Sequence, residues 1–427
     1  MRILHTADWH IGKRLQGYSR LEEQREVLNE IIALADREAV DLVLVAGDLF
    51  DTFIPQADAQ DLLYDALKRL TNGGKRPVVA IAGNHDDPIH IEAQDHFGRE
   101  CGILFAGYPK TEIRAHQLSC AVRLLHSAPG FVELQLPDRP VPVRILLTPY
   151  ANEARFRAYM GMDQPDAEMR DQLHHHWQTL ADTYLDNRGI NLLVAHLFMM
   201  NRGGEKPLEP DDERSIVQVG GANIIYTDLI PEQVQYAALG HLHRYQMLGG
   251  GPCPVVYSSS PLAYSFAEAD QQKYVVVIDA EPGQPAQVRP VPLLSGKRLV
   301  KKSFPQVAKA LEWTAQNPNC YVEITMQTAT YLTSIETRQL AGSHLNIVSI
   351  VPEVRLPVPD LAADGPLFAK DSVPDEAPVS AKPAAIDLSQ PIDKLFANYF
   401  KSKHKEQAPN ERLTALFQEI LATEPTE

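Results

Sequence analysis

Short runs of carboxylate, imidazole and amide side chains recur along this chain of 427 residues, and most of them follow an apolar run. These are the groups with which proteins bind hard or borderline divalent cations. Together they offer enough ligands for two cations that share one carboxylate, an arrangement suited to in-line attack on phosphorus. The sequence therefore predicts a metal-dependent phosphoesterase. The runs are Asp8-Trp9-His10, Gly47-Asp48-Leu49-Phe50-Asp51, Gly83-Asn84-His85-Asp86, Ala195-His196 and Gly240-His241-Leu242-His243.

The spacing within the runs indicates which side chains can act together. Asp8 and His10 are alternate residues at the end of an expected strand, so both can reach one cation. Asp48 ends a buried apolar run, and its two carboxylate oxygens can bridge two cations. His241 and His243 also alternate, so both imidazoles can face one site.

Two further runs add a neutral ligand and a group for proton transfer. Asn84 offers an amide oxygen, whereas His85 follows it directly, points elsewhere and is free for proton transfer. His196 ends another apolar run. Each run alone has an ordinary explanation, because glycine-aspartate and glycine-asparagine pairs are common turns. All five in this order make coincidence a poor explanation, which leaves a metal-free scaffold as the alternative, and the full ligand set argues against that.

The segments between these runs alternate between strand and helix patterns. Residues 41–46 form a continuous apolar, β-branched run, as buried strands do. Residues 57–71 place leucines at helical spacing. The alternation predicts an α/β layered domain whose ligands lie at strand ends. Further strands are expected at 3–6, 78–82, 143–147, 190–195, 236–239, 255–258 and 274–278, and helices at 21–39 and 166–187.

The pattern changes near residue 297. From there to 351 the order strand, helix, strand, helix, strand contains none of the five runs, which indicates a separate small domain. The next segment is rich in proline, alanine and aspartate without an apolar period, as in a flexible linker. We therefore expect a catalytic domain at 1–280, a small α+β capping domain at 281–355, a linker at 356–391 and a helical tail at 392–427.

The tail contains two stretches with apolar residues at helical spacing. Two amphipathic helices after a long tether fold poorly by themselves. They dock either on a partner or on the chain's own core, and the tether favours a partner. The apolar positions that would dock are Leu395, Phe396, Phe400, Leu413, Leu416, Phe417 and Ile420.

Composition limits the class of protein. The net charge of −15 counts against a chain that binds nucleic acid by itself, because phosphate contacts need positive charge. Bound cations at the site or a basic partner protein would supply such charge. The four cysteines form no CxxC pair, which points to a reducing cytoplasm. No apolar run reaches the length of a membrane span, and the N-terminus has the pattern of a strand and not of a signal peptide.

The order DxH, GDxxD, GNHD, a single histidine and GHxH resembles the calcineurin-like metallophosphoesterase superfamily. The opening Met-Arg-Ile-Leu-His-Thr-Ala-Asp-Trp-His-Ile-Gly-Lys, with Val-Ala-Gly-Asp-Leu-Phe-Asp-Thr and Ala-Gly-Asn-His-Asp, is similar to the bacterial SbcD family of double-strand-break repair nucleases. Segments 238–244 and 260–266 extend the likeness, which covers roughly residues 1–280. One departure is Ser258-Ser259-Ser260-Pro261, where the family leads us to expect glycine before Ser-Pro.

The resemblance implies a layered β-sandwich core flanked by helices, with two divalent cations. It assigns catalytic roles to His85, which would stabilise the transition state or protonate the leaving oxygen, and to Asp86, which would orient His85 or only cap a turn. The cations would be manganese, although ligand type also allows zinc or iron. One cation would be held by Asp8, His10 and His243, the other by Asn84, His196 and His241, with Asp48 between them.

The resemblance also implies a substrate and partners. The substrate would be DNA. The protein would have 3′-to-5′ exonuclease activity on double strands and endonuclease activity on single strands and hairpins. An SbcC-type coiled-coil ATPase would bind the tail helices in a heterotetramer, and it would bind the ATP, because this chain has no GxxxxGK[ST] loop. The small domain would orient duplex DNA. A homodimer contact would use Leu62, Leu63 and Leu67, for which a sheet-facing core role is the alternative.

Two rival functions remain open at this point. A phosphatase or small-molecule phosphodiesterase of the same superfamily accounts better for the acidic charge, but not for the second domain, the linker and the docking helices. The second rival function is that of a binding scaffold that keeps a vestigial metal site. A measurement of metal content distinguishes it from an enzyme, because two bound divalent ions per chain would contradict a vestigial site.

Overall fold

The computed structural model describes residues 1–114, 121–150, 167–207 and 224–354 apart from 329, 331 and 345, together with Phe400 and Leu413. It divides into two compact units, Met1–Val358 and Pro359–Glu427. In the second unit Phe400 and Leu413 are helical. The expected linker and the docking residues Leu395, Phe396, Leu416, Phe417 and Ile420 lie outside the described residues.

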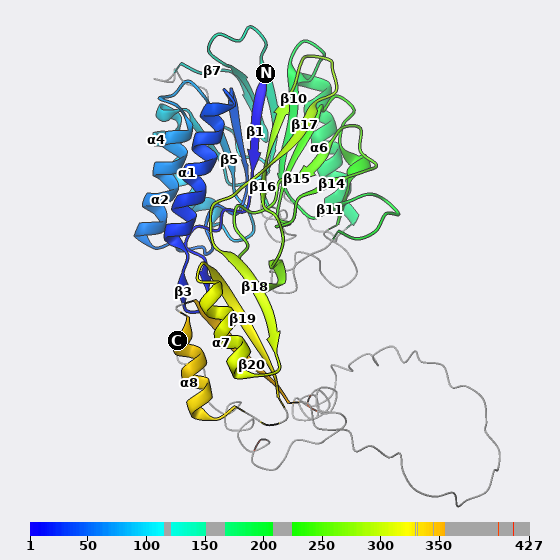
Figure 1. The fold of residues 1–427 in the computed structure, drawn as a ribbon. Helices are drawn as coiled ribbons and strands as arrows, with labels where there is room; N and C mark the ends of the chain where they lie inside the picture. The colour runs from blue at the N-terminus through cyan, green and yellow to red at the C-terminus, as the bar shows by residue number, and fades with distance from the viewer. Residues whose placement is uncertain are drawn as a thin grey trace, which may run out of the picture. The chain divides into compact units, whose positions relative to one another are not determined.

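Two β-sheets pack face to face in the first unit (Figure 1). In the six-stranded sheet, the four strands β1, β4, β5 and β6 run parallel, with an antiparallel pair at one edge. Its order is β17 (Gln287–Pro292), β16 (Tyr274–Asp279), β1 (Arg2–Thr6), β4 (Leu42–Ala46), β5 (Val78–Ile81) and β6 (Ile103–Ala106).

The second sheet has seven strands, of which β15, β13, β10 and β9 are parallel. Its order is β14 (Gln246–Leu248), β15 (Val255–Tyr257), β13 (Tyr236–Gly240), β10 (Ile190–His196), β9 (Val143–Thr148), β8 (Phe131–Gln135) and β7 (Arg123–Ala128). The strands expected from the sequence are confirmed, whereas β6, β14, β17 and the β7–β8 hairpin were not foreseen.

Helices cover the outer faces of the two sheets, α1, α2 and α4 on one side and α6 on the other (Figure 1). Strands β4 and β9 are buried at every position because both of their faces are covered. The layered α/β sandwich expected from the sequence is therefore confirmed. The helices are α1 (Leu21–Arg37), α2 (Ala57–Leu70), α3 (Pro88–Ala93), α4 (Asp95–Cys101) and α6 (Ala167–Tyr184).

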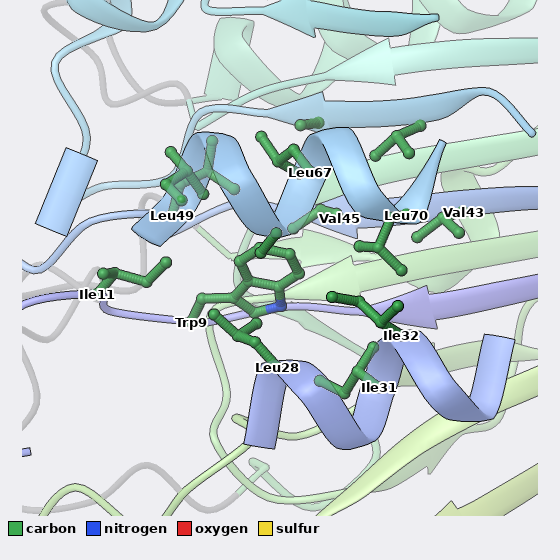
Figure 2. Close-up of a cluster of buried hydrophobic side chains, with 14 of the residues drawn as sticks. Trp9, Ile11, Leu28, Ile31, Ile32, Val43, Val45, Leu49, Leu67 and Leu70 are labelled. Atoms are coloured by element: carbon green, nitrogen blue, oxygen red, sulfur yellow. The ribbon is translucent and has the colours of Figure 1, made fainter. Parts of the chain in front are cut away.

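The leucines of α2 belong to the core between the helices and the six-stranded sheet. Figure 2 shows Leu67 and Leu70 in the same buried cluster as Trp9 and Val45. Leu62, Leu63 and Leu67 are all at most 2% exposed. A second copy cannot reach these side chains, so the expectation of a dimer contact through them is wrong. Helical spacing of apolar residues looks the same for a core stripe and for an interface.

Residues 298–354 carry a sheet and a core of their own. The three strands are parallel and pack on α7 and α8 through residues such as Phe304, Val322 and Leu340. The expected β-α-β-α-β order is thus confirmed. The elements are β18 (Arg298–Phe304), α7 (Val307–Gln316), β19 (Cys320–Thr328), α8 (Ser334–Ser343) and β20 (Ile347–Val354).

The start of this small unit remains a proposal. Strand β17 pairs with β16 in the six-stranded sheet, so residues up to Pro292 pack with the first sheet. We therefore propose a boundary near Arg298 in place of 281. A cluster of Leu15, Phe266, Leu299 and Tyr321 joins the two parts of the Met1–Val358 unit. Within the described ranges, no helix is long and apolar enough to cross a membrane.

A buried ion pair in the seven-stranded sheet gives a test of stability. Arg144 on β9 donates to Glu133 on β8 at 2.8 Å and to Asp186 at 2.5 Å. Burial raises the pKa of Glu133, but hydrogen bonds from Arg144 and His126 outweigh burial and lower it below its ordinary value. A lowered folded-state pKa stabilises the protein above the unfolded-state pKa, and this contribution is lost as the pH falls through the folded-state value.

Arg144→Met is therefore expected to destabilise the protein at pH 7 by about 3 kcal/mol, because the buried Glu133 carboxylate loses its cationic partner and keeps only the contact with His126. The difference from the wild type should shrink at an acidic pH below 4.5, as Glu133 takes up a proton. Thermal midpoints at both pH values measure this. Arg139→Met is the control, because Arg139 is half exposed in its pair with Asp41 and such pairs contribute little. Equal losses for Arg144→Met at both pH values would contradict the ionic origin.

Candidate metal centre

The polar runs of the sequence converge where parallel strands of both sheets end. From the six-stranded sheet come residues that follow β1, β4 and β5, and from the seven-stranded sheet residues that end or follow β10 and β13. Carboxyl ends of parallel strands meet at one edge of a sheet, which is why the runs gather there. All eight side chains are less than 9% exposed: Asp8, His10, Asp48, Asn84, His85, His196, His241 and His243.

Several of these residues hold an uncommon backbone conformation. Asp8, His10, Asp48 and His241 all have positive φ angles, between 42° and 109°. Such conformations cost on the order of 1 kcal/mol each outside glycine and persist where the surroundings enforce them. Hydrogen bonds between the loops do this: His85 N donates to Asp48 Oδ1 at 2.8 Å, and His241 N donates to Asp8 Oδ1 at 2.8 Å.

Three glycines allow the loops to approach this closely. A Cβ at Gly83 would lie 2.1 Å from Asp48 Oδ1, and one at Gly47 would lie 2.2 Å from His196 Nδ1. A Cβ at Gly240 would lie 1.8 Å from the main-chain oxygen of Ala46 in the opposite sheet. Any side chain at these positions would separate the ligands, so the glycines before Asp, Asn and His are required by space as well as by turn geometry.

The ligand atoms form two adjoining groups. In the first, Nε2 of His10 lies 3.0 Å from Nε2 of His243, and Asp8 offers a carboxylate oxygen within 4.8 Å of both imidazoles. In the second, Nε2 of His196 lies 2.8 Å from Oδ1 of Asn84.

Asp48 lies between these groups, and His241 borders the second. The Oδ2 atom of Asp48 is 3.4 Å from Nε2 of His10 in the first group and 3.5 Å from Nε2 of His196 in the second. The ring of His241 is centred 5.6 Å from the ring of His196. The structure thus brings all seven expected ligands together.

The electrostatics of the cluster fit divalent cations. Burial lowers the pKa of His10 and of His196 well below 6.5, so both rings are neutral at pH 7 and present lone pairs. Burial, together with the nearby Asp86 and Asp8, raises the pKa of Asp48. Two imidazole nitrogens 3.0 Å apart beside buried carboxylates need a positive charge among them. Mixed oxygen and nitrogen donors of this kind are the ligands of manganese, iron or zinc.

His85 borders the cluster but is held differently from the ligands. Its ring stands edge-on to that of His10, with ring centres 4.7 Å apart. Its Nδ1 lies 2.9 Å from the main-chain oxygen of Asp51. A carbonyl oxygen only accepts, so Nδ1 carries the hydrogen and the other ring nitrogen is the one suited to proton transfer.

The contacts of Asp86 bear on the two roles expected of it, orienting His85 or capping a turn. One of its oxygens accepts the backbone N–H groups of Leu49 and Gly83, and the other accepts that of Phe50, at 2.8–3.0 Å. The carboxylate therefore fastens the turn after β4 to the turn after β5. Of the two roles open from the sequence, the geometry supports turn capping, and the partner of the His85 ring is the Asp51 carbonyl.

The sequence did not single out three residues that contact the ligands. Glu268 Oε1 lies 3.1 Å from His243 Nδ1, and the Lys273 ammonium donates to the other Glu268 oxygen. The ring of Tyr264 is centred 5.4 Å from that of His10 and 5.9 Å from that of His243. The stretch 260–266 carried the family resemblance, and this was the available signal that the segment reaches the site.

Comparison with known proteins agrees with this geometry. The model of the calcineurin-like phosphoesterase family matches residues 1–245. SbcD subunits of the nuclease SbcCD are similar over most of the chain. The one from Bacillus subtilis is 34% identical, covering 82% of this chain and 85% of that protein. The one from Rhodobacter capsulatus is 33% identical, covering 73% and 75%, and the one from Staphylococcus epidermidis 29%, covering 69% and 70%.

The matched region includes every residue of the metal cluster, and the similarity to the SbcD proteins continues beyond it. The chain belongs to the calcineurin-like phosphoesterase family and, within it, to the family of SbcD subunits of the nuclease SbcCD.

Proposed function

We propose that this protein is a manganese-dependent DNA nuclease that hydrolyses phosphodiesters at DNA ends, in hairpins and in single strands. The observation that carries the chemistry is the position of Asp48 Oδ2, which lies within 3.5 Å of a histidine nitrogen in each ligand group. One carboxylate oxygen between two sets of donors is the arrangement of a two-cation clamp. The names of the relatives, each called a nuclease, support the choice of a nucleic acid as substrate.

In this proposal one cation is held by Asp8, His10 and His243 and the other by Asn84, His196 and His241, with Asp48 shared. When bound, the two cations would lower the pKa of a shared water and polarise the phosphodiester. The chain's own groups do the rest. The buried carboxylates and neutral imidazoles fix the donor positions. His85, in the imidazolium form that carries hydrogen on both ring nitrogens, delivers the proton on the nitrogen opposite its Asp51 contact to the departing sugar oxygen and returns to the neutral ring.

Membership of the family supports a choice of substrate and partners. We propose 3′-to-5′ exonuclease action on duplex ends and endonuclease action on hairpins and single strands, as a cytoplasmic repair, recombination and replication enzyme. The partner is an SbcC-type coiled-coil ATPase, bound by the tail in a heterotetramer that also contains two copies of this chain. Such a partner would supply the grip on DNA that a chain of net charge −15 lacks.

The small unit would orient duplex DNA. Lys297, Arg298, Lys301 and Lys302 lie at or near the edge strand β18 and are exposed, which suits contact with phosphates. Lys301 lies 3.7 Å from Glu323, so part of this charge is already paired within the sheet. The solvated-surface interpretation of these lysines is the alternative, and loss of DNA binding on their replacement decides between the two.

The test is hydrolysis by the purified full chain with Mn²⁺. A hairpin-ended duplex and bis-p-nitrophenyl phosphate are the two substrates, each with and without the coiled-coil ATPase and ATP. We expect manganese-dependent cleavage of the hairpin that rises when partner and ATP are added. Hydrolysis of the small diester with DNA intact in every mixture would keep the metal chemistry and assign the site to small phosphoesters. No hydrolysis of either substrate, with no bound cations, would indicate a scaffold.

A further inference from the structure

A buried acid and a buried base lie behind one of the metal ligands. Glu268, at the end of the short helix η2 (Phe266–Glu268), is 1% exposed, and Lys273, just before β16, is 5% exposed. Glu268 Oε1 lies 3.1 Å from Nδ1 of His243, on the side of the ring away from the ligand cluster. Buried charges of this kind are costly unless they are paired and hydrogen-bonded, so their presence needs an explanation.

The contact determines which nitrogen of His243 carries the hydrogen. A carboxylate only accepts, so the hydrogen is on Nδ1 and the lone pair is on Nε2. That Nε2 lies 3.0 Å from Nε2 of His10, inside the first ligand group. A metal-binding histidine requires this tautomer, and a carboxylate acceptor on the far nitrogen also makes the ring a stronger donor to the cation.

Lys273 donates hydrogen bonds to both the Glu268 carboxylate and the backbone of His243, and so holds the two in place. Its ammonium donates to Glu268, to the main-chain oxygen of His243 at 2.8 Å and to Ser260 Oγ at 3.0 Å. Glu268 Oε1 also accepts from the backbone N–H of Tyr264 at 3.3 Å, and the Tyr264 ring packs edge-on against His243. Neither the ring nor the main chain of His243 can therefore move without breaking a buried contact.

The second ligand group is built differently. Nδ1 of His196 lies 2.9 Å from the main-chain oxygen of Ala46, which is a neutral acceptor. The ionised acceptor behind His243 and the neutral one behind His196 make the two groups unequal. The first group should bind its cation more tightly than its ligand types alone imply.

We propose that Glu268, held in place by Lys273, is a positioning residue for His243 at the first cation site. The proposal rests on the division of ligands proposed above. A purely structural ion pair between Glu268 and Lys273 is the alternative, and it makes a different prediction when both charges are removed together.

The test measures Mn²⁺ binding to the full chain after removal of metals, with the electron paramagnetic resonance signal of free Mn²⁺ as the readout, and thermal midpoints alongside. Three variants are compared with the wild type: Glu268→Gln, the double variant Glu268→Gln/Lys273→Met, and Glu133→Gln. The double variant removes both buried charges with little change of shape. Glu133→Gln is the matched control, since Glu133 pairs with the buried Arg144, which lies beside the start of β10, whereas His196 lies at the end of that strand.

We expect the wild type to bind two Mn²⁺ and Glu268→Gln to bind one of them about 10- to 100-fold more weakly. The double variant should regain thermal stability without regaining affinity. Glu133→Gln should lose stability and keep both affinities. The inference is overturned if affinity recovers with stability in the double variant, if Glu133→Gln weakens binding equally, or if Glu268→Gln binds as the wild type does. A wild type that binds fewer than two Mn²⁺ overturns the proposed cation pair itself.

Discussion

Replacing Asp48 by alanine is expected to remove both cations and nearly all phosphodiester hydrolysis. Its Oδ2 is 3.4 Å from His10 Nε2 and 3.5 Å from His196 Nε2, so a single oxygen borders both ligand groups. Loss of the cations removes several kcal/mol of transition-state stabilisation, which corresponds to a fall in kcat/KM on the order of 10³-fold or more. Metal content by mass spectrometry and hydrolysis of bis-p-nitrophenyl phosphate measure the two effects.

Asp41→Ala is the control for this variant. Asp41 directly precedes the same strand β4, at the end away from the cluster, where it accepts from the backbone N–H of Arg2 at 2.8 Å. It should keep both cations and wild-type hydrolysis. An Asp48→Ala protein that still holds two cations per chain would show that another group bridges them.

His85→Ala is expected to keep both cations and to lose about 10²- to 10⁴-fold in kcat, the usual contribution of a general acid. The ring borders His10 without belonging to either ligand group, and its Nδ1 is occupied by the Asp51 carbonyl. Metal content should therefore equal that of the wild type. Single-turnover cleavage of a hairpin DNA measures the loss.

The leaving group distinguishes proton donation from other roles of His85. A sugar oxygen departs poorly without a proton, whereas p-nitrophenolate departs well without one. The loss in His85→Ala should thus be large for DNA and small for bis-p-nitrophenyl phosphate. His175→Ala, at an exposed position on α6, is the control. Equal losses on both substrates would assign His85 to stabilising charge on the phosphoryl oxygens, and loss of metal would make it a ligand.

The sequence was sufficient to predict that the expected ligands lie together, because each ends or follows a buried strand. Asp48 after β4 and His196 at the end of β10 stand at the point where a continuous apolar run stops, and parallel strands bring such points together. Strand alternation, the reason given for pairing Asp8 with His10 and His241 with His243, does not hold, because these residues follow β1 and β13 in loops where Asp8, His10 and His241 have positive φ angles. The shared edge of the strand ends, and not alternation along a strand, brings them together.

The remaining features depend on contacts between distant parts of the chain. Glu268 meets His243 across 25 residues, and no local pattern distinguishes its carboxylate from an exposed one. Asp86 stands beside His85 in the sequence, yet its oxygens serve backbone groups 36 and 37 residues away. The leucines of α2 have the spacing of an interface and of a core alike. In each case the structural role of the residue depends on which distant part of the chain it contacts, and not on its type or its neighbours in the sequence.

The ligands come from two separate sheets, and this has a thermodynamic consequence. Asp8, His10, Asp48 and Asn84 follow strands of the six-stranded sheet, whereas His196, His241 and His243 belong to the seven-stranded sheet. Any cation that needs donors from both sheets binds only when the sheets are packed together. By mass action it then favours the folded chain, by about 2.7 kcal/mol when its free concentration is one hundred times its dissociation constant. The free concentration of the metal thus affects the free energy of unfolding of the protein as well as its rate of hydrolysis.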